Sequence, residues 1–255
     1  MPSRTLIVTL TGFLTTVAAA AASMGDARAA VRGGCDLGDP TAVLIREGDQ
    51  TAADGRLLVR WDLAADVVLE GPSSPPSAAY RSFLAGLRAR RVVTDPGRAL
   101  ARSPTPNNRI VLVNARRWIK PATCLEKYLY GLQHTRVSTF AEPTEFSSFV
   151  LASPDNRRER IYWYSVNRNG IGNASPLTDP VKADVAAGWR VRFVLHSHPF
   201  KPSDDTLNGI IAPSEPDAHF QMNMRAAVEL PEARITNGVD TVRMPAASFP
   251  QFKAE

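Results

Sequence analysis

Three runs of aromatic and β-branched residues in the second half of this 255-residue chain constrain its fold most strongly. They cover Glu145–Leu151, Arg160–Val166 and Trp189–His198, and residues of these types favour strands. Residues with helical spacing precede and follow them, at Cys124–Val137 and from about Glu215 to Leu230. We therefore expect an α+β (α/β-type) fold, with a mixed sheet flanked by helices.

Shorter patterns predict the remaining elements. Arg109–Val113 has the composition of a strand, and the Pro-rich stretch Ser103–Asn108 before it is typical of a linker or long loop. The other expected elements are a strand at Arg56–Trp61, helices at Ala78–Arg91 and near Pro180–Ala187, and a hairpin over Ala233–Met244 that turns at Asn237-Gly238.

Composition excludes several classes of protein. Hydrophobic residues make up 44% of the chain, which is too many for a fully disordered protein, and 16 Gly with 20 Pro are too few for a collagen-like one. The formal net charge of +5 is spread without a long basic run. A nucleic-acid partner is therefore not expected.

The start of the chain resembles a secretory signal. Arg4 precedes the apolar run Leu6–Ala22, and Ala27-Arg28-Ala29 fits a small-x-small cleavage site. A transmembrane anchor is the alternative, but the run is short, rich in Thr and Ala, and lacks a basic stop-transfer flank. We expect residues 1–29 to be cleaved and the protein to be exported, periplasmic or secreted, with no membrane attachment afterwards.

The chain has two cysteines, Cys35 and Cys124. In an oxidising compartment such a pair is typical of a disulfide. Alternatively, Cys124 at the start of a helix has the position of a reactive thiol, which His134 or His196 could assist in a Cys/His cell-wall peptidase.

Two histidines stand two residues apart at the end of an apolar strand, in Leu195-His196-Ser197-His198-Pro199. Residues at this spacing point to the same face of a strand, so both imidazoles can reach one metal ion. Further along, Pro213-Ser214-Glu215-Pro216-Asp217 opens a helix. That segment also has the pattern of an ordinary capping box, so Asp217 is either a helix-capping residue or a third ligand.

His-Ser-His-Pro followed by Ser-x-x-Asp, with a Glu at the start of an upstream strand, resembles the JAMM signature of the JAB/MPN metallopeptidases. The resemblance covers roughly residues 125–249 and implies a curved sheet with a cytidine-deaminase-like core. It divides the chain into a signal peptide, 1–29, an N-terminal region of unknown role, 30–108, and a metallopeptidase domain, 109–255.

The resemblance also implies the chemistry. Zn²⁺ would be bound by His196, His198 and Asp217, with Glu145 as general base and Ser214 as oxyanion helper. Three protein ligands leave a fourth position, where zinc activates a water. We therefore expect an exported zinc-dependent metallopeptidase that hydrolyses a peptide or isopeptide bond in a peptide or protein substrate.

Alternatives remain at two positions. Asp205 is the second choice for the third ligand, and Glu142 lies three residues before Glu145, which is preferred because it leads directly into a strand. Besides the Cys124 peptidase, a catalytically inactive JAB/MPN-like binding scaffold is an alternative function. The sequence does not indicate an oligomeric state.

Overall fold

The computed structural model describes residues 37–46, 55–67, 69–71, 77–169, 175–201 and 209–253. The expected signal peptide, Cys35 and Asp205 lie outside these residues. None of the described helices combines the length and apolar character needed to cross a bilayer.

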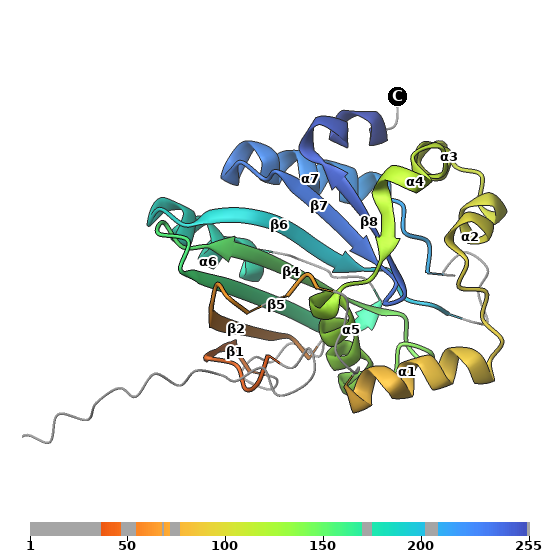
Figure 1. The fold of residues 1–255 in the computed structure, drawn as a ribbon, viewed down its shortest axis with the longest axis horizontal. Coiled ribbons are helices and arrows are strands. Elements are labelled where there is room, and N and C mark those ends of the chain that lie inside the picture. The colour runs from red at the N-terminus through yellow and green to blue at the C-terminus, as the bar shows by residue number, and fades with distance from the viewer. Residues whose placement is uncertain are drawn as a thin grey trace, which may run out of the picture.

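The described residues form one open, mixed eight-stranded sheet with the order β1-β2-β5-β4-β6-β7-β8-β3 (Figure 1). Neighbouring strands are antiparallel except β6 and β7, which are parallel. The strands are β1 (Ala42–Ile45), β2 (Leu57–Ala64), β3 (Ile119–Pro121), β4 (Thr144–Ala152), β5 (Arg158–Asn169), β6 (Arg190–Ser197), β7 (Glu232–Thr236) and β8 (Asp240–Pro245).

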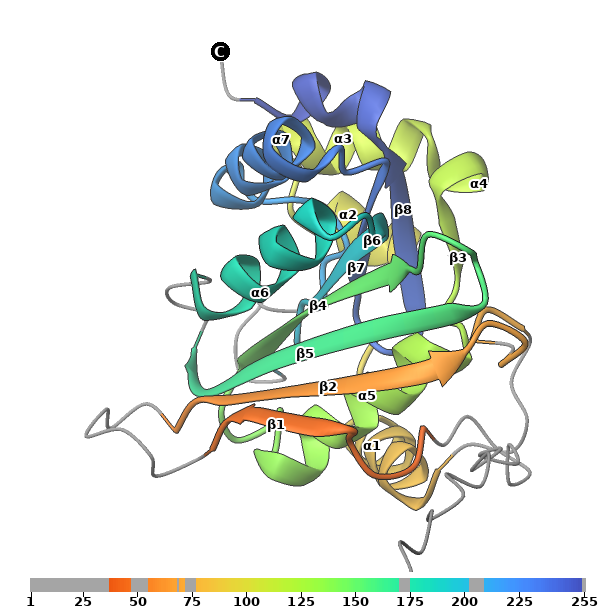
Figure 2. The same cartoon turned by 90° about the vertical axis from the view of Figure 1, so that its left-hand side faces the viewer.

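Helices cover both faces of the sheet. The chain forms α1 (Ala78–Ala89), α2 (Pro96–Arg102), α3 (Pro106–Val113), α4 (Ala115–Trp118), α5 (Cys124–Arg136), α6 (Ser175–Ala186), α7 (Glu215–Val228) and a 3-10 helix, η2 (Ala246–Phe252). Figure 2 shows α6 and α7 on one side of the sheet and α1 and α5 on the other. The overall α+β class, with a mixed sheet between helices, is therefore confirmed.

Strand periodicity produces two cores. Phe149 and Leu151 of β4 pack with α6, α7 and η2 on one face, whereas Val150 between them packs with α1 and α5 on the other. Successive side chains of a strand point to opposite faces, so strands that are apolar throughout have to be covered on both sides. The strands in the second half of the chain are apolar almost throughout, which agrees with burial of both of their faces.

Most expected elements are confirmed. The strands around residues 56–61, 145–151, 160–166 and 189–198 are present, as are the helices near 78–91, 124–137 and 215–230 and the terminal hairpin. At the hairpin turn, Gly238 has a φ of +83°, and a Cβ there would lie 2.8 Å from the ring of Tyr130. The turn therefore needs glycine for both its backbone angle and its close approach to α5.

The strand expected at Arg109–Val113 is wrong, because this segment belongs to the helix α3. Thr105 caps the helix by accepting a hydrogen bond from the backbone N–H of Asn108, and Pro106 occupies the first turn, where it has no N–H to satisfy. The linker or long loop expected at 103–108 is only a short connection, residues 103–105 between α2 and α3, because residues 106–108 belong to α3. Its Thr-Pro pair is a helix start, which outweighs the β-propensity of the residues that follow.

The N-terminal region is joined to the rest through the sheet. β2 pairs with β5 over its full length, from Leu57 opposite Ser165 to Ala64 opposite Arg158. Leu100 of α2 and Val111 of α3 are buried in the same core as α7. Residues before and after position 108 therefore share one sheet and its cores.

A buried ion pair joins α5 to the β7–β8 hairpin. Glu126 is fully buried, and its Oε2 accepts hydrogen bonds from the backbone N–H of Thr123 at 2.6 Å and the hydroxyl of Thr241 at 2.8 Å. Its Oε1 lies 3.4 Å from Nη1 of Arg234. The Arg234 guanidinium also lies 3.5 Å from the ring centroid of Phe193. A second guanidinium, that of Arg243, lies 3.9 Å from the same Oε1, so the carboxylate is compensated mainly by Arg234, more distantly by Arg243, and by the two hydrogen bonds.

We predict that Arg234→Met lowers the free energy of unfolding by about 3 to 5 kcal/mol, because it leaves the buried Glu126 carboxylate poorly compensated. Adding Glu126→Gln removes that charge and is expected to restore part of the loss. Urea unfolding measures both, with Arg116→Met on the surface as a control that changes stability by less than about 0.5 kcal/mol. A double variant less stable than Arg234→Met would contradict this account.

Candidate metal centre

The two histidines lie where β6 ends. His196 is in the strand and pairs with Ile235 of β7, and the backbone N–H of His198 donates to the carbonyl of Thr236 just beyond. His196 is buried and His198 is half-buried. Their spacing places both rings on one face, as expected, with the two Nε2 atoms 3.2 Å apart.

Asp217 joins this pair from the first turn of α7. Its Oδ1 lies 3.3 Å from Nε2 of His196, and its Oδ2 lies 3.4 Å from Nε2 of His198. The sequence therefore identified three residues that the fold brings together. Among the described residues, they form the group of His, Cys, Asp and Glu side chains that could hold a metal ion.

The ligand atoms of this group are close enough together to share one small metal ion. With metal–ligand bonds of about 2.0 to 2.1 Å, ligand atoms at tetrahedral corners are about 3.3 to 3.4 Å apart. The separation of the two Nε2 atoms, 3.2 Å, is close to this value, and the two oxygens of Asp217 lie 3.3 and 3.4 Å from one imidazole each. One ligand atom from each of the three residues lies within 4.8 Å of the other two. Two imidazoles and a carboxylate are also a donor set that zinc accepts, so these residues fit the ion that the resemblance implies.

A backbone carbonyl fixes the orientation of His198. Its Nδ1–H donates to the carbonyl oxygen of Ile210, which directs Nε2 toward Asp217 and His196. Metal-binding histidines generally donate their second N–H in this way. Ile210 follows Gly209, whose φ of +62° and close approach to the Phe200 ring allow the loop to turn back to the site.

Asp217 is both a capping residue and a member of the group. The backbone N–H of Ser214 donates to its Oδ2 at 2.8 Å, and the backbone N–H of Asp217 donates to the Ser214 hydroxyl at 3.3 Å, which completes the expected capping box. The capping role raised by the sequence is therefore confirmed, and the role of Asp217 as a third ligand stays a prediction. The cap fixes the carboxylate in the orientation that faces the histidines.

Charge and burial shift the pKa values of these groups. Burial alone would raise the pKa of Asp217, but His196 and His198 outweigh it and hold this pKa well below its ordinary value. Burial lowers the pKa of His198, whereas Asp217, Glu145 and the Ile210 carbonyl raise it more, to about 9. The carboxylates therefore stabilise positive charge at this position, and a metal ion that binds here has to displace the proton of His198.

Glu145 lies at the start of β4, in an irregular part of the sheet. Thr144 pairs with Asn169 but Phe146 pairs with Ser165, so the register shifts at Glu145. Such bulges redirect side chains. The pKa of Glu145 is raised above its ordinary value, mainly by burial. The nearby His198 and His196 partly offset this increase, and Asp217 adds to it.

A pocket of about 310 Å³ connects Glu145 to the metal-binding group. It is lined by Glu145, His198, Asp217, Ser214, Ser103, Thr105, Asn108, Ile210, Ala212 and Pro213. Both the expected base and the expected oxyanion helper therefore line it. The Ser214 hydroxyl donates to Oδ2 of Asp217 at 2.7 Å, so it has to turn away from that bond to reach a substrate. Glu142, the other candidate base, is exposed and does not line the pocket.

Sequence analysis missed two contributions to the site. Ser103, Thr105 and Asn108 line the pocket from a segment expected to be a linker. Ser197, between the two histidines, is buried on the opposite face, where its hydroxyl accepts a hydrogen bond at 3.0 Å from the backbone N–H of Phe146. This contact ties the start of β4, and with it Glu145, to the end of β6. The sequence did offer a signal for this contact, because Ser197 is a polar residue at the end of an otherwise apolar strand.

The remaining candidates lie elsewhere. Cys124 is buried at the start of α5, does not line the pocket and is not a free thiol, whereas a nucleophilic role would require one. Its pairing with Cys35 stays a prediction, because Cys35 lies outside the described residues. His134 contacts the hydroxyl of Thr139, and His219 is exposed.

We predict that Ser197→Ala lowers the free energy of unfolding by about 1 to 3 kcal/mol, because the buried N–H of Phe146 loses its acceptor. Zinc affinity, measured by competition with a chromophoric chelator, is expected to fall as well. Ser148→Ala is the matched control, since the Ser148 hydroxyl is buried with no hydrogen-bond partner among the described residues. It should leave stability unchanged or slightly higher, and equal losses in the two variants would contradict the assignment.

Comparison of the chain with protein-family models, with curated proteins and with solved structures found no match. Its function is therefore inferred from the geometry of the site.

Proposed function

We propose that this protein is a zinc-dependent metallopeptidase of the JAB/MPN type that hydrolyses a peptide or isopeptide bond. The observation that carries the proposal is the convergence of His196, His198 and Asp217, which each bring one ligand atom within 4.8 Å of the others, with the two imidazole Nε2 atoms 3.2 Å apart. Glu145 in the same pocket supplies a further carboxylate for proton transfer. The order of elements, with α5 before β4 and α7 after β6, agrees with the order that the resemblance implies.

The proposed chemistry divides between the ion and the chain. Bound zinc would supply Lewis acidity and lower the pKa of a water molecule to about 7. Glu145 accepts a proton from the attacking water and passes it to the leaving amine. Its raised pKa suits this task, because a carboxylate whose pKa is raised toward the working pH accepts a proton more readily and can still pass it on. The Ser214 hydroxyl turns from Asp217 toward the substrate carbonyl oxygen, where negative charge develops.

An exported location and a peptide or protein substrate belong to the same proposal. Residues 1–29 have the pattern of a cleaved signal, and Cys124 is not a free thiol, which agrees with an oxidising compartment. The lining of the pocket by Ser103, Thr105 and Asn108 adds uncharged polar groups around the expected position of the cleaved bond.

Metal content tests the first half of the proposal. The full chain purified with zinc is expected to hold about one zinc ion, measured by mass spectrometry of the metal, and His198→Ala should lose most of it because two ligands remain. His219→Ala is the matched control, since this exposed histidine is outside the group. If the wild-type protein holds no zinc and the His198→Ala variant is equally stable, the result would favour the catalytically inactive binding scaffold.

Activity tests the second half. Glu145→Gln removes the proton acceptor but no member of the metal-binding group, so we expect kcat for a cleaved peptide to fall about 100- to 10,000-fold while zinc content stays unchanged. Glu142→Gln, three residues away and exposed, should retain wild-type kcat. Cleavage is measured by mass spectrometry of a peptide library. Equal activity in the two variants would exclude Glu145 as the base.

A further inference from the structure

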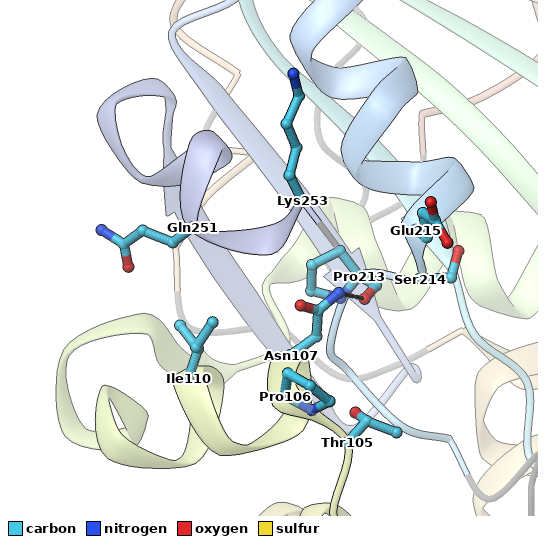
Figure 3. Close-up of a pocket in the computed structure, with 9 residues that line it drawn as sticks. All are labelled: Thr105, Pro106, Asn107, Ile110, Pro213, Ser214, Glu215, Gln251 and Lys253. Carbon is cyan, nitrogen blue, oxygen red and sulfur yellow. Dashed lines mark hydrogen bonds between the residues drawn. The ribbon is translucent and has the colours of Figure 1, made fainter. Parts of the chain in front are cut away.

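Figure 3 shows a second and larger pocket, of about 670 Å³. It adjoins the 310 Å³ pocket at Glu145, His198 and Asp217, which we call the metal pocket. The larger pocket is lined by Thr105, Pro106, Asn107, Ile110, Pro213, Ser214, Glu215, Gln251 and Lys253. Thr105, Pro213 and Ser214 line both pockets. A ligand that extends past Ser214 can therefore occupy the two together, and we refer to the larger one as the side pocket.

The side pocket is built where three segments distant in the sequence meet. Its walls are the start of α3, the start of α7 and the C-terminal η2 (Figure 3). Asn107 joins them, because its Nδ2 donates to the carbonyl of Pro213 at 2.9 Å and to the carbonyl of Phe252 at 3.3 Å. Phe252 is fully buried against Trp118, with ring centroids 5.7 Å apart. The walls are thus held by hydrogen bonds and by the core.

The chemistry of the lining favours an uncharged ligand. Ile110 and the rings of Pro106 and Pro213 contribute apolar surface, while Glu215 and Lys253 contribute one negative and one positive charge. The formal charges cancel, so the pocket as a whole favours neither sign. Its volume lies within the range of about 300 to 1,000 Å³ that is typical of sites for small organic ligands.

We propose that the side pocket binds the part of the peptide substrate next to the cleaved bond and accepts an apolar side chain against Ile110. This inference rests on the proposed peptidase function. The substrate runs past Ser214, with its reacting carbonyl in the metal pocket and the neighbouring residue in the side pocket. The segment 103–110 thereby sets specificity, although it lies before the part of the chain that resembles the metallopeptidases.

The first test fills the side pocket. Ile110→Trp places a larger side chain there without altering a residue of the metal pocket, and Val113→Trp on the same helix is the control, since Val113 is 86% exposed and lines neither pocket. Both full-length variants and the wild type are incubated with a peptide library, and cleavage sites are read by mass spectrometry. Ile110→Trp should reduce kcat/KM for peptides with an apolar residue beside the cleaved bond by at least about tenfold.

A second variant tests for a change of specificity rather than a loss of activity. Ile110→Asp adds a negative charge to the pocket and should shift the preferred residue from apolar to basic. Thermal unfolding and zinc content of each variant, compared with Val113→Trp, show whether the fold is retained. An unchanged cleavage profile in both Ile110 variants, with an active wild type, would overturn the proposal.

A binding measurement separates this inference from the peptidase function. Isotope-labelled wild-type protein is titrated with N-acetyl-leucine methylamide and with its lysine and glutamate counterparts, and backbone amide shifts are followed by NMR. Shifts at Ile110, Asn107 and Lys253 caused by the leucine compound alone are the expected result. If the wild type cleaves no peptide, the peptidase proposal fails, and these shifts still support an apolar-peptide site. If the leucine compound causes no shift there, the side-pocket proposal fails.

Discussion

Two parallel strands cannot be joined by a tight turn, so the chain that leaves β6 must cross a face of the sheet before β7 begins. The crossing segment here is α7, and it starts near the end of β6 where His196 and His198 lie. In the order β4-β6-β7, this is the single parallel pair among the described strands. The parallel pairing thus brings a strand end and a helix start together, and the candidate metal site depends on that meeting.

The start of α7 needs hydrogen-bond acceptors for its own backbone N–H groups. The first N–H groups of a helix lack partners within the helix. The Ser214–Asp217 capping box supplies side-chain acceptors for the backbone N–H groups of Ser214 and Asp217. The same carboxylate faces both imidazoles, at 3.3 and 3.4 Å. Under the proposed zinc binding, the stability of α7 and the affinity for the ion are coupled through one side chain. Change at Asp217 affects both properties, which limits what can replace it.

Local patterns in the sequence were sufficient for much of this arrangement. The two-residue period of a strand placed His196 and His198 on one face, and the Ser-x-x-Asp spacing located the start of α7. The same reasoning failed at Arg109–Val113, where β-branched residues indicated a strand but Thr105 and Pro106 begin a helix. The walls contributed by Ser103, Thr105 and Asn108 could not be predicted, because their position depends on contacts between segments far apart in the chain. Asn107, which bonds to Pro213 and Phe252, is an example.

The pairing of β2 with β5 limits how this protein can be shortened. A fragment that begins at residue 109 would keep every residue of the metal-binding group but lose the neighbour of β5 from Arg158 to Ser165. The backbone N–H and C=O groups freed along that edge would be available to another chain, and the aromatic side chains Tyr162 and Trp163 beside them would lose part of their cover. Such an edge promotes aggregation. A fragment designed to carry the site should therefore retain β2.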